Sequence, residues 1–337
     1  GILLKSDRNR IESNELRDVL FGIYLFQSDE NLIRGQSIYG RSYLESGERG
    51  SGIHLWSSGN NVIEKNTISQ TRDGLFLQNS NHNKIRDNQI SNLRYGVHYM
   101  FSDSNIFENN IFSDSLAGAA IMYSRQIEFR RNLFLHNRGF SSFGILLQEC
   151  EQCVAEENVI LDNGVGIFME ALRKSTIRAN VIAQNDIAIE MFGSVDGNRI
   201  EDNNFVDNLS PLQLIGRSTN TRWSNNFWSD YDGYDLDGDG KGDIPHKIQN
   251  VFEYLEGNYP RLRIYLYSAA AHALASAEKA FPVLQFSSEI DPNPSMRSVL
   301  AGVPEGATRP RSSHLPTALF SLAMLTSGIV LFWRGQS

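Results

Sequence analysis

Residues 51–68 read SGIHLWSSGNNVIEKNTI, residues 73–90 read DGLFLQNSNHNKIRDNQI and residues 95–112 read YGVHYMFSDSNIFENNIF. Three more copies follow, and each of the six contains a glycine near its start, at Gly52, Gly74, Gly96, Gly118, Gly144 and Gly166. Four of the five intervals between these glycines are 22 residues and the other is 26. A fixed period of about twenty residues is the signature of a solenoid whose coils stack on one another.

Each copy contains two predicted strands. Apolar residues alternate in the first strand, as in Ile53 and Leu55, and alternate residues of a strand face opposite sides of a sheet. The second strand carries the pattern I-x-x-N-x-I, as in Ile63–Ile68. The repeat therefore predicts an all-β fold, a right-handed parallel β-helix of about nine coils, followed by a C-terminal extension that contains helical segments.

The asparagines of the second strand form one column. Equivalent residues of stacked coils lie one strand spacing apart, about 4.8 Å, so their amide side chains can hydrogen-bond from coil to coil. The expected members of this structural ladder are Asn66, Asn88, Asn109, Asn132, Asn158, Asn180, Asn203 and Asn225.

The repeat ends in the last third of the chain. We expect the β-helix over residues 1–228, an acidic Asp/Gly loop and cap over 229–263, a helix and a proline-rich extension over 264–313, and a hydrophobic tail over 314–337. The tail contains an uncharged run, Thr317–Trp333, followed by Arg334. Such a run is at the short end for a membrane-spanning helix and would place the solenoid outside the cytosol, at the inner membrane. The alternative is a tail packed against a partner protein.

The composition limits which partners and which cellular compartment we expect for the chain. The net charge of −8 argues against nucleic acid. The only cysteines form a Cys150-x-x-Cys153 motif, too few for a disulfide framework. Cys153 shares a column with Asn61, Asn83, Ser104, Ser175, Asn198 and Asn220. This favours a structural role, with a disulfide as the alternative outside the cytosol. The chain begins within a repeat, so we expect preceding residues to be missing or processed.

The outward residues of the first strand are unusual for an exposed sheet. They are His54 and Trp56, Phe76 and Gln78, His98 and Met100, Ala120 and Met122, Leu146 and Gln148, and Phe168 and Glu170. Met100 and Met122 are equivalent residues of adjacent coils, and His98 precedes Met100 by two residues on the same face, about 7 Å away. Thioether and imidazole groups without a carboxylate suit Cu(I). We therefore predict a copper site at His98, Met100 and Met122, with His54 further along; the alternative is a protein-binding patch.

A second candidate site follows the solenoid. The segment DLDGDGKGD contains Asp235, Asp237, Asp239 and Asp243 and matches the first nine positions of a calcium-binding loop. His246 stands where such loops place a bidentate glutamate. We predict a structural calcium site, with a metal-free acidic turn as the alternative.

A polysaccharide-cleaving enzyme would need paired carboxylates. The outward face offers Glu170 and Glu190, which we expect one coil apart at about 5 Å, the separation of a retaining pair. No dense group of acids and bases surrounds them in the sequence. We therefore predict a binding protein that is not an enzyme, with a carbohydrate-binding or polysaccharide-cleaving β-helix protein as the alternative.

Several segments of the chain resemble the NosD family. They are RGSGIHLW at 49–56, RDGLFL at 72–77, RYGVHYMFSDSN at 94–105, LAGAAIMYS at 116–124, FGILLQEC at 143–150 and NFWSDYDGYDLDGDGKGDIPHK at 226–247. The resemblance covers about residues 1–300. The combination of YGVHYM with the DLDGDGKGD ending is specific, whereas the repeat alone would indicate only a carbohydrate-type β-helix.

The resemblance implies a periplasmic accessory protein that handles copper during maturation of nitrous oxide reductase in denitrification. It implies association with the NosF–NosY ABC transporter, with the reductase and with a copper donor chaperone. The alanine-rich segment Tyr265–Phe281 and the segment Asp291–Pro294 are then similar to a transporter-docking extension.

Overall fold

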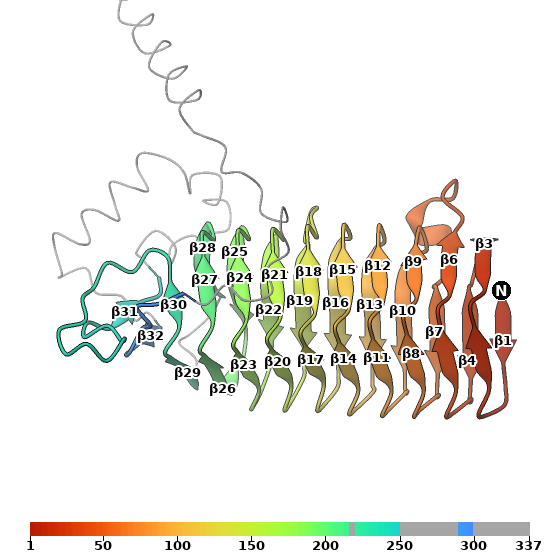
Figure 1. The fold of residues 1–337 in the computed structure, drawn as a ribbon, viewed down its shortest axis with the longest axis horizontal. Helices are drawn as coiled ribbons and strands as arrows, with labels where there is room; N and C mark the ends of the chain where they lie inside the picture. Colours follow the sequence, from red (N-terminus) through yellow and green to blue (C-terminus); the bar gives the residue numbers. More distant parts are fainter. Residues whose placement is uncertain (216–219, 250–288, 299–337) are drawn as a thin grey trace, which may run out of the picture. The chain divides into compact units, whose positions relative to one another are not determined.

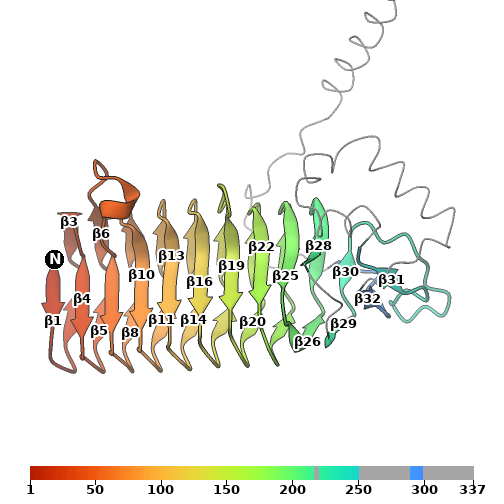
Figure 2. The ribbon, with the colours of Figure 1, turned by 180° about the vertical axis from the view of Figure 1, so that it is seen from behind.

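The computed structural model describes residues 1–215, 220–249 and 289–298. These residues form the predicted right-handed parallel β-helix (Figures 1 and 2). Three sheets of ten parallel strands run along it, so the solenoid has ten coils rather than about nine. Counting copies in the sequence gives too few coils because the first and last coils depart from the repeat.

Most strands of sheet A contain a repeat glycine or directly follow one. Its strands are β1 (Ile2–Leu4), β4 (Ile23–Phe26), β7 (Ile53–Trp56), β10 (Asp73–Gln78), β13 (Tyr95–Met100), β16 (Ala117–Met122), β19 (Phe143–Gln148), β22 (Val165–Glu170), β25 (Ile187–Phe192) and β28 (Ser210–Ile215).

Sheet B comes next in each coil. Its strands are β2 (Arg10–Glu12), β5 (Leu32–Arg34), β8 (Val62–Glu64), β11 (Lys84–Arg86), β14 (Ile106–Glu108), β17 (Glu128–Arg130), β20 (Val154–Glu156), β23 (Thr176–Arg178), β26 (Asp196–Glu201) and β29 (Asn220–Ser224).

Sheet C completes the coil. Its strands are β3 (Glu15–Val19), β6 (Ser37–Gly40), β9 (Thr67–Ser69), β12 (Gln89–Ser91), β15 (Ile111–Ser113), β18 (Leu133–Leu135), β21 (Val159–Leu161), β24 (Val181–Ala183), β27 (Asn204–Val206) and β30 (Phe227–Trp228). A loop between β6 and β7, before Gly52, contains the 3-10 helix η1 (Ser46–Glu48).

The pattern I-x-x-N-x-I spans two strands, not the single strand we expected. Ile63 lies in β8 and Ile68 in β9, and Lys65 between them has a φ of 55°. A left-handed residue turns the chain sharply, so the two halves of the pattern belong to different sheets. Each coil therefore has three strands, and the asparagine of the pattern lies at the corner between sheets B and C.

From the third to the ninth coil, a buried asparagine follows this corner and bonds to the next coil. In Asn88 the backbone N–H and Nδ2 donate to Asn110 Oδ1 at 3.0 and 2.9 Å, and Nδ2 also donates to the Ile63 carbonyl at 2.9 Å. Equivalent bonds between side chains join Asn66, Asn88, Asn110, Asn132, Asn158, Asn180, Asn203 and Asn226.

Two predicted members of the ladder were wrong by one residue. Asn109 and Asn225 have φ values of 54° and 55° and occupy the left-handed corner, whereas Asn110 and Asn226 point inwards and carry the bonds. Both errors fall in Asn-Asn pairs, and asparagine is favoured at left-handed positions as well as in the ladder. The correct asparagine lies three residues after the buried residue of the preceding strand, as Asn110 does after Phe107.

A carboxylate closes the C-terminal end of the ladder. Asp291, in β32 (Ile290–Asp291), is fully buried and accepts through Oδ2 from the N–H and Nδ2 of Asn226 at 3.0 and 2.9 Å. It also accepts from Trp228 Nε1 at 3.2 Å, and β32 pairs antiparallel with β31 (His246–Lys247). The segment Asp291–Pro294, which the resemblance linked to docking, therefore contacts the last coil.

The remainder of the predicted extension cannot be compared with the structure. The expected helix Tyr265–Phe281 and the hydrophobic tail 314–337 lie outside the described residues. Within the described parts of the chain, no helix is long and apolar enough to cross a membrane.

The inward residues of sheet A form the core that the alternation predicted. Ile53, Leu55, Leu75 and Leu77 have no exposed surface. The repeat glycines allow the close approach of neighbouring coils, because a Cβ on Gly118 would lie 2.6 Å from the Gly144 carbonyl oxygen. Packing of the coils therefore explains both the alternating apolar residues and the glycine that comes before them in the repeat.

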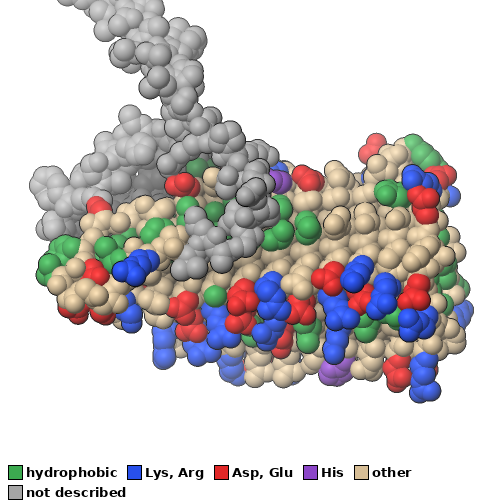
Figure 3. Space-filling model, in the orientation of Figure 1, with side chains coloured by type: hydrophobic (Ala, Val, Ile, Leu, Met, Phe, Trp, Pro, Cys, Tyr) green, Lys and Arg blue, Asp and Glu red, His purple; other side chains and the backbone are tan. Residues whose placement is uncertain are grey.

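The outward face of sheet B carries charges that alternate in sign from coil to coil. One column reads Glu12, Arg34, Glu64, Arg86, Glu108, Arg130, Glu156, Arg178 and Glu201. Glu64 bonds to Arg86 at 2.6 Å and also pairs with Arg34. Figure 3 shows this row of blue and red side chains along the lower half of the solenoid. Because neighbouring charges neutralise one another, this face presents no block of like charge.

We expect the substitution Asn110→Ala to destabilise the solenoid by about 3 kcal/mol or more, because it leaves buried donors of Asn88 without an acceptor. The exposed neighbour provides the control, since Asn109→Gly keeps a residue that tolerates the left-handed corner. Urea unfolding followed by circular dichroism measures both changes. Equal destabilisation by the two substitutions would contradict the ladder.

Candidate metal centre on the outer face of sheet A

The strand register places the predicted methionine pair side by side. Met100 in β13 pairs directly with Met122 in β16, and His98 pairs with Ala120. Both methionines are partly exposed on the outward face, whereas the methionines at 169 and 191 of the same sheet point into the core. The backbones of the two methionines thus lie one strand spacing apart, about 4.8 Å, and His98 precedes Met100 by two residues on the same face.

A buried carboxylate orients the imidazole. His98 Nδ1 lies 3.2 Å from Asp73 Oδ2, and Arg94 holds the same carboxylate with two bonds, from Nε at 2.9 Å and from Nη2 at 2.7 Å. Burial opposes ionisation of Asp73, but the hydrogen bonds from His98 and Arg94 outweigh it and keep the pKa of Asp73 below its ordinary value. Arg94 Nη2 also lies 3.2 Å from His98 Nδ1. In the tautomer whose Nδ1 donates to Asp73, Nε2 presents its lone pair. Metal-binding histidines commonly have this arrangement.

Asp73 and Arg94 were not singled out by the sequence interpretation. Asp73 pairs in register with Tyr95, which pairs with Ala117, so an ionisable residue occupies an otherwise uncharged column. That irregularity is the signal that could have identified it. The partner, Arg94, lies four residues before His98, but a spacing of four within a strand has no special meaning without the three-dimensional register.

His54 belongs to a different environment. Its ring lies between Tyr24 and Phe76, with centroid separations of 4.4 and 4.3 Å, and neither ring nitrogen has a hydrogen-bond partner among the described residues. Burial lowers the pKa of His54 from 6.5 to about 4. Phe76 separates His54 from His98 in the register, so the two imidazoles lie two strands apart, about 10 Å. The structure therefore does not bring His54 to the methionine pair.

The remaining group can bind one soft cation. One imidazole and two thioethers are neutral, polarisable ligands, which favour Cu(I) over hard divalent ions. The same Asp–His–Arg grouping recurs where His136 Nδ1 lies 2.7 Å from Asp162 Oδ2 and Arg138 holds Asp162. His136 and Asp162 directly follow strands of sheet C, and the described strands of that sheet contain no methionine. The methionines, rather than the Asp–His pair alone, distinguish the site on sheet A.

Three of the four predicted calcium ligands come together. Asp235, Asp237 and Asp239 each have a carboxylate oxygen within 4.8 Å of the others. These carboxylates also accept backbone bonds within the loop; Asp235 accepts from the N–H groups of Gly238 at 2.7 Å and Gly240 at 2.9 Å. The fourth predicted ligand, Asp243, is not part of this group and accepts from the Leu236 N–H at 2.7 Å.

The residue at the glutamate position of the loop is also turned away from solvent. His246 is buried in β31 and packs against Trp228, with ring centroids 4.9 Å apart. Calcium binding at the three clustered carboxylates stays a prediction.

The two outward glutamates are not directly opposite one another. Glu190 pairs with Phe168 and Glu170 pairs with Phe192, so the glutamates are diagonal neighbours. Diagonal positions on one face of a sheet are about 7–8 Å apart, not the 5 Å we expected. The expected separation was therefore wrong, and with it the match to a retaining pair.

The fold defines a parallel β-helix protein, and solved structures agree with this class. The periplasmic alginate epimerase AlgG superposes with a TM-score of 0.54 at 18% identity, over 65% of this chain and 59% of that chain. The A-module of the mannuronan C-5 epimerase AlgE6 of Azotobacter vinelandii gives 0.50 at 17% identity, over 65% of this chain and 69% of that chain. At these identities the likeness shows the fold alone.

Sequence relatives define the family. The family described as "Periplasmic copper-binding protein (NosD)" matches residues 30–233. A protein of Pseudomonas aeruginosa named "Probable ABC transporter binding protein NosD" is 38% identical over 305 residues, which cover 85% of this chain and 70% of the relative. Its namesake in Stutzerimonas stutzeri is 36% identical over 315 residues, 88% of this chain and 71% of the relative. The chain belongs to the NosD family.

We expect His54 to make the copper-free protein less stable at acidic pH. Because its pKa is about 4 in the folded chain against 6.5 ordinarily, the unfolded chain binds the extra proton between these values. Stability is therefore complete above 6.5 and falls as the pH drops towards 4. Thermal unfolding across this range measures the effect. The control His54→Phe keeps the ring stack but cannot titrate, and an unchanged pH dependence in this variant would contradict the assignment.

Proposed function

We propose that this chain is a periplasmic accessory protein that binds Cu(I) at His98, Met100 and Met122. The observation that carries the proposal is the register that pairs Met100 with Met122 on the same face as His98, whose Nδ1 is held by Asp73. The family description supplies copper and the periplasm as the expected metal and compartment.

The ligand set suits a protein that passes its metal on. Thioethers carry no proton, so release of copper from Met100 and Met122 needs no proton to replace it. The site lies on an open sheet face rather than in a closed cage, because both methionines and His98 are partly exposed. A partner with stronger soft ligands can therefore approach the bound ion directly.

The partners follow from the names of the relatives. Both are named as ABC transporter binding proteins, and we propose the same association for this chain, with a transporter of the NosF–NosY type. We further propose that copper arrives from a donor chaperone and is delivered to nitrous oxide reductase during assembly of its copper sites. Contact with the inner membrane would then come through the transporter or through the C-terminal tail.

Loss of both thioethers is expected to weaken copper binding. We predict that the double substitution Met100→Leu and Met122→Leu lowers Cu(I) affinity by more than about 100-fold, because only His98 remains of the set. Titration against a competing Cu(I) chelator measures this. The matched control, Met169→Leu with Met191→Leu, changes two adjacent methionines of the same sheet that point inwards. Unchanged affinity in the first variant would overturn the site.

The carboxylate behind His98 gives a separate prediction. Asp73→Asn keeps the shape of the side chain but weakens its hold on His98, and we expect Cu(I) affinity to fall by about 10- to 100-fold. The control Asp162→Asn disturbs an equivalent Asp–His–Arg group away from the methionines. If both variants lose stability equally and neither loses copper, Asp73 has only a structural role.

A further inference from the structure

The two cysteines occupy adjacent inner columns of the turn between sheets A and B. Cys150 and Cys153 lie between β19 and β20 and are 1% and 3% exposed. Preceding coils place serine in the first column, at Ser28, Ser58, Ser80, Ser102 and Ser124. The second column contains Asn31, Asn61, Asn83 and Asn105, and after Cys153 it continues with Ser175 and Asn198.

This description corrects the column predicted for Cys153. Asn105, not Ser104, accepts from the Asn83 N–H, and Ser104 lies at a left-handed corner with a φ of 57°. Asn220 pairs in register with Asp196 and therefore does not follow Asn198. The predicted small-residue environment of Cys153 nevertheless holds, since its N–H donates to Ser175 Oγ at 2.9 Å.

Side chains three residues apart in this turn meet inside the solenoid. In the second coil, Asn31 Nδ2 donates to Ser28 Oγ at 2.9 Å. Cys150 and Cys153 occupy the equivalent positions, and both side chains are buried in the turn. Cys150 Sγ donates to the Gln148 carbonyl at 3.3 Å, and Cys153 Sγ donates to the Glu151 carbonyl at 3.7 Å. Neither thiol has a charged partner in these bonds, so both are held as neutral groups within one turn.

We propose that Cys150 and Cys153 form an intramolecular disulfide in the mature protein. The structure shows both as buried free thiols, three residues apart in one turn. The periplasmic location within the proposed function supplies the oxidising conditions on which this inference rests. The oxidant is a disulfide of the thiol–disulfide exchange class.

The exchange proceeds in two balanced steps. The thiolate of one cysteine attacks one sulfur of the oxidant, and a mixed disulfide forms as the oxidant's other sulfur leaves as a thiolate. The other cysteine then loses its proton and attacks the sulfur of the first, which releases the second thiolate. Two thiols have lost two protons and two electrons, and the oxidant has become a dithiol. Because both cysteines are buried, the exchange takes place before this turn packs.

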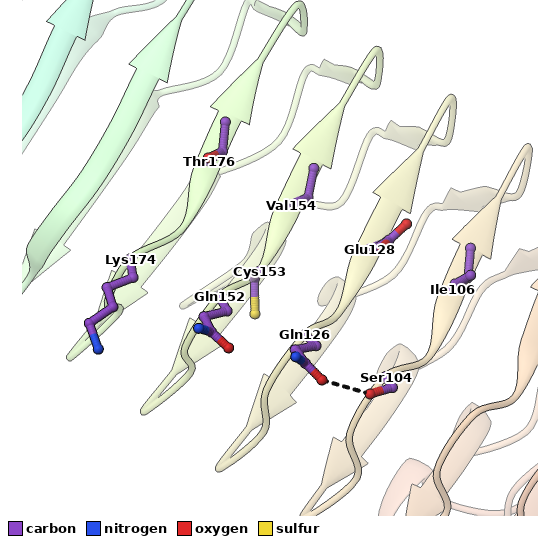
Figure 4. A pocket seen from close by; sticks show the side chains of 9 residues that line it. All are labelled: Ser104, Ile106, Gln126, Glu128, Gln152, Cys153, Val154, Lys174 and Thr176. Carbon is purple, nitrogen blue, oxygen red and sulfur yellow. Dashed lines mark hydrogen bonds between the residues drawn. The ribbon is translucent and has the colours of Figure 1, made fainter.

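Figure 4 shows Cys153 with the other side chains that line one pocket. Cys153 and Gln152 belong to the wall of a polar groove of about 500 Å³, which also includes Gln126 and Lys174. The residues that line this groove do not include His98, Met100 or Met122 of the proposed copper site.

The disulfide has a consequence for copper. Thiolates are strong soft ligands for Cu(I), so a free dithiol beside the core would compete with the thioethers of sheet A. Oxidation removes both thiolates. The soft ligands that stay accessible are then those of the proposed copper site, Met100 and Met122. The disulfide also closes the turn covalently.

Alkylation of the full chain, isolated from the periplasm without reductant, tests the proposal. The protein is unfolded in guanidinium with a Cu(I) chelator and iodoacetamide, so that a copper-bound thiol is not mistaken for a disulfide. We expect neither cysteine to be alkylated, and both to be alkylated after reduction, as read by peptide mass spectrometry. Alkylation of both residues without reduction would overturn the disulfide.

A variant that copies the residues of the neighbouring coils provides the second measurement. The double substitution Cys150→Ser and Cys153→Ser places in each column the residue found at Ser124 and Ser175. Reductant should lower the thermal midpoint of the natural protein by about 2–4 °C and leave the variant unchanged. Equal shifts would overturn the proposal. Cu(I) titration of the same variant is independent: loss of copper binding there would contradict the site at His98, Met100 and Met122, not the disulfide.

Discussion

The hydrogen bond from one asparagine to the next is the interaction on which this solenoid depends. Each buried amide accepts from the coil before it and donates to the coil after it, as Asn88 does between Asn66 and Asn110. A one-residue slip would point the amide out of the turn and leave its partners buried without bonds, at a cost of about 1–3 kcal/mol for each group. The ladder therefore fixes the register of all three sheets at once.

That fixed register gives the outward face its chemistry. Equivalent residues of neighbouring coils come together although they are 22 residues apart, which is how Met100 meets Met122. The same rule produces the alternating charges of sheet B and the serine column before Cys150. Equivalent positions of the repeat thus form rows along the solenoid. The residue types within one row determine what that row can bind.

The repeat predicted the fold well because its signals are periodic. Buried residues, repeat glycines and most of the ladder could be assigned by counting. The errors at Asn109 and Asn225 arose where one residue type satisfies two different backbone requirements, a left-handed corner and an inward amide. The irregular column could have drawn attention to Asp73, but its contact with His98 joins residues 25 apart in different strands and needs the three-dimensional register. The calcium loop matched in sequence, but its backbone uses Asp243 for a local bond.

The closure of the ladder by Asp291 bears on the order in which the chain folds. Neighbouring coils can form as soon as the next 22 residues or so are available, since each amide bonds one coil away. The last coil is different: its partner lies 65 residues further along the chain from Asn226. During synthesis the end of the solenoid at Asn226 and Phe227 therefore lacks these partners until residues 289–298 emerge. An exposed parallel edge is a template for pairing with another chain. Truncation upstream of Asp291 would thus leave Asn226 and Trp228 permanently without this acceptor.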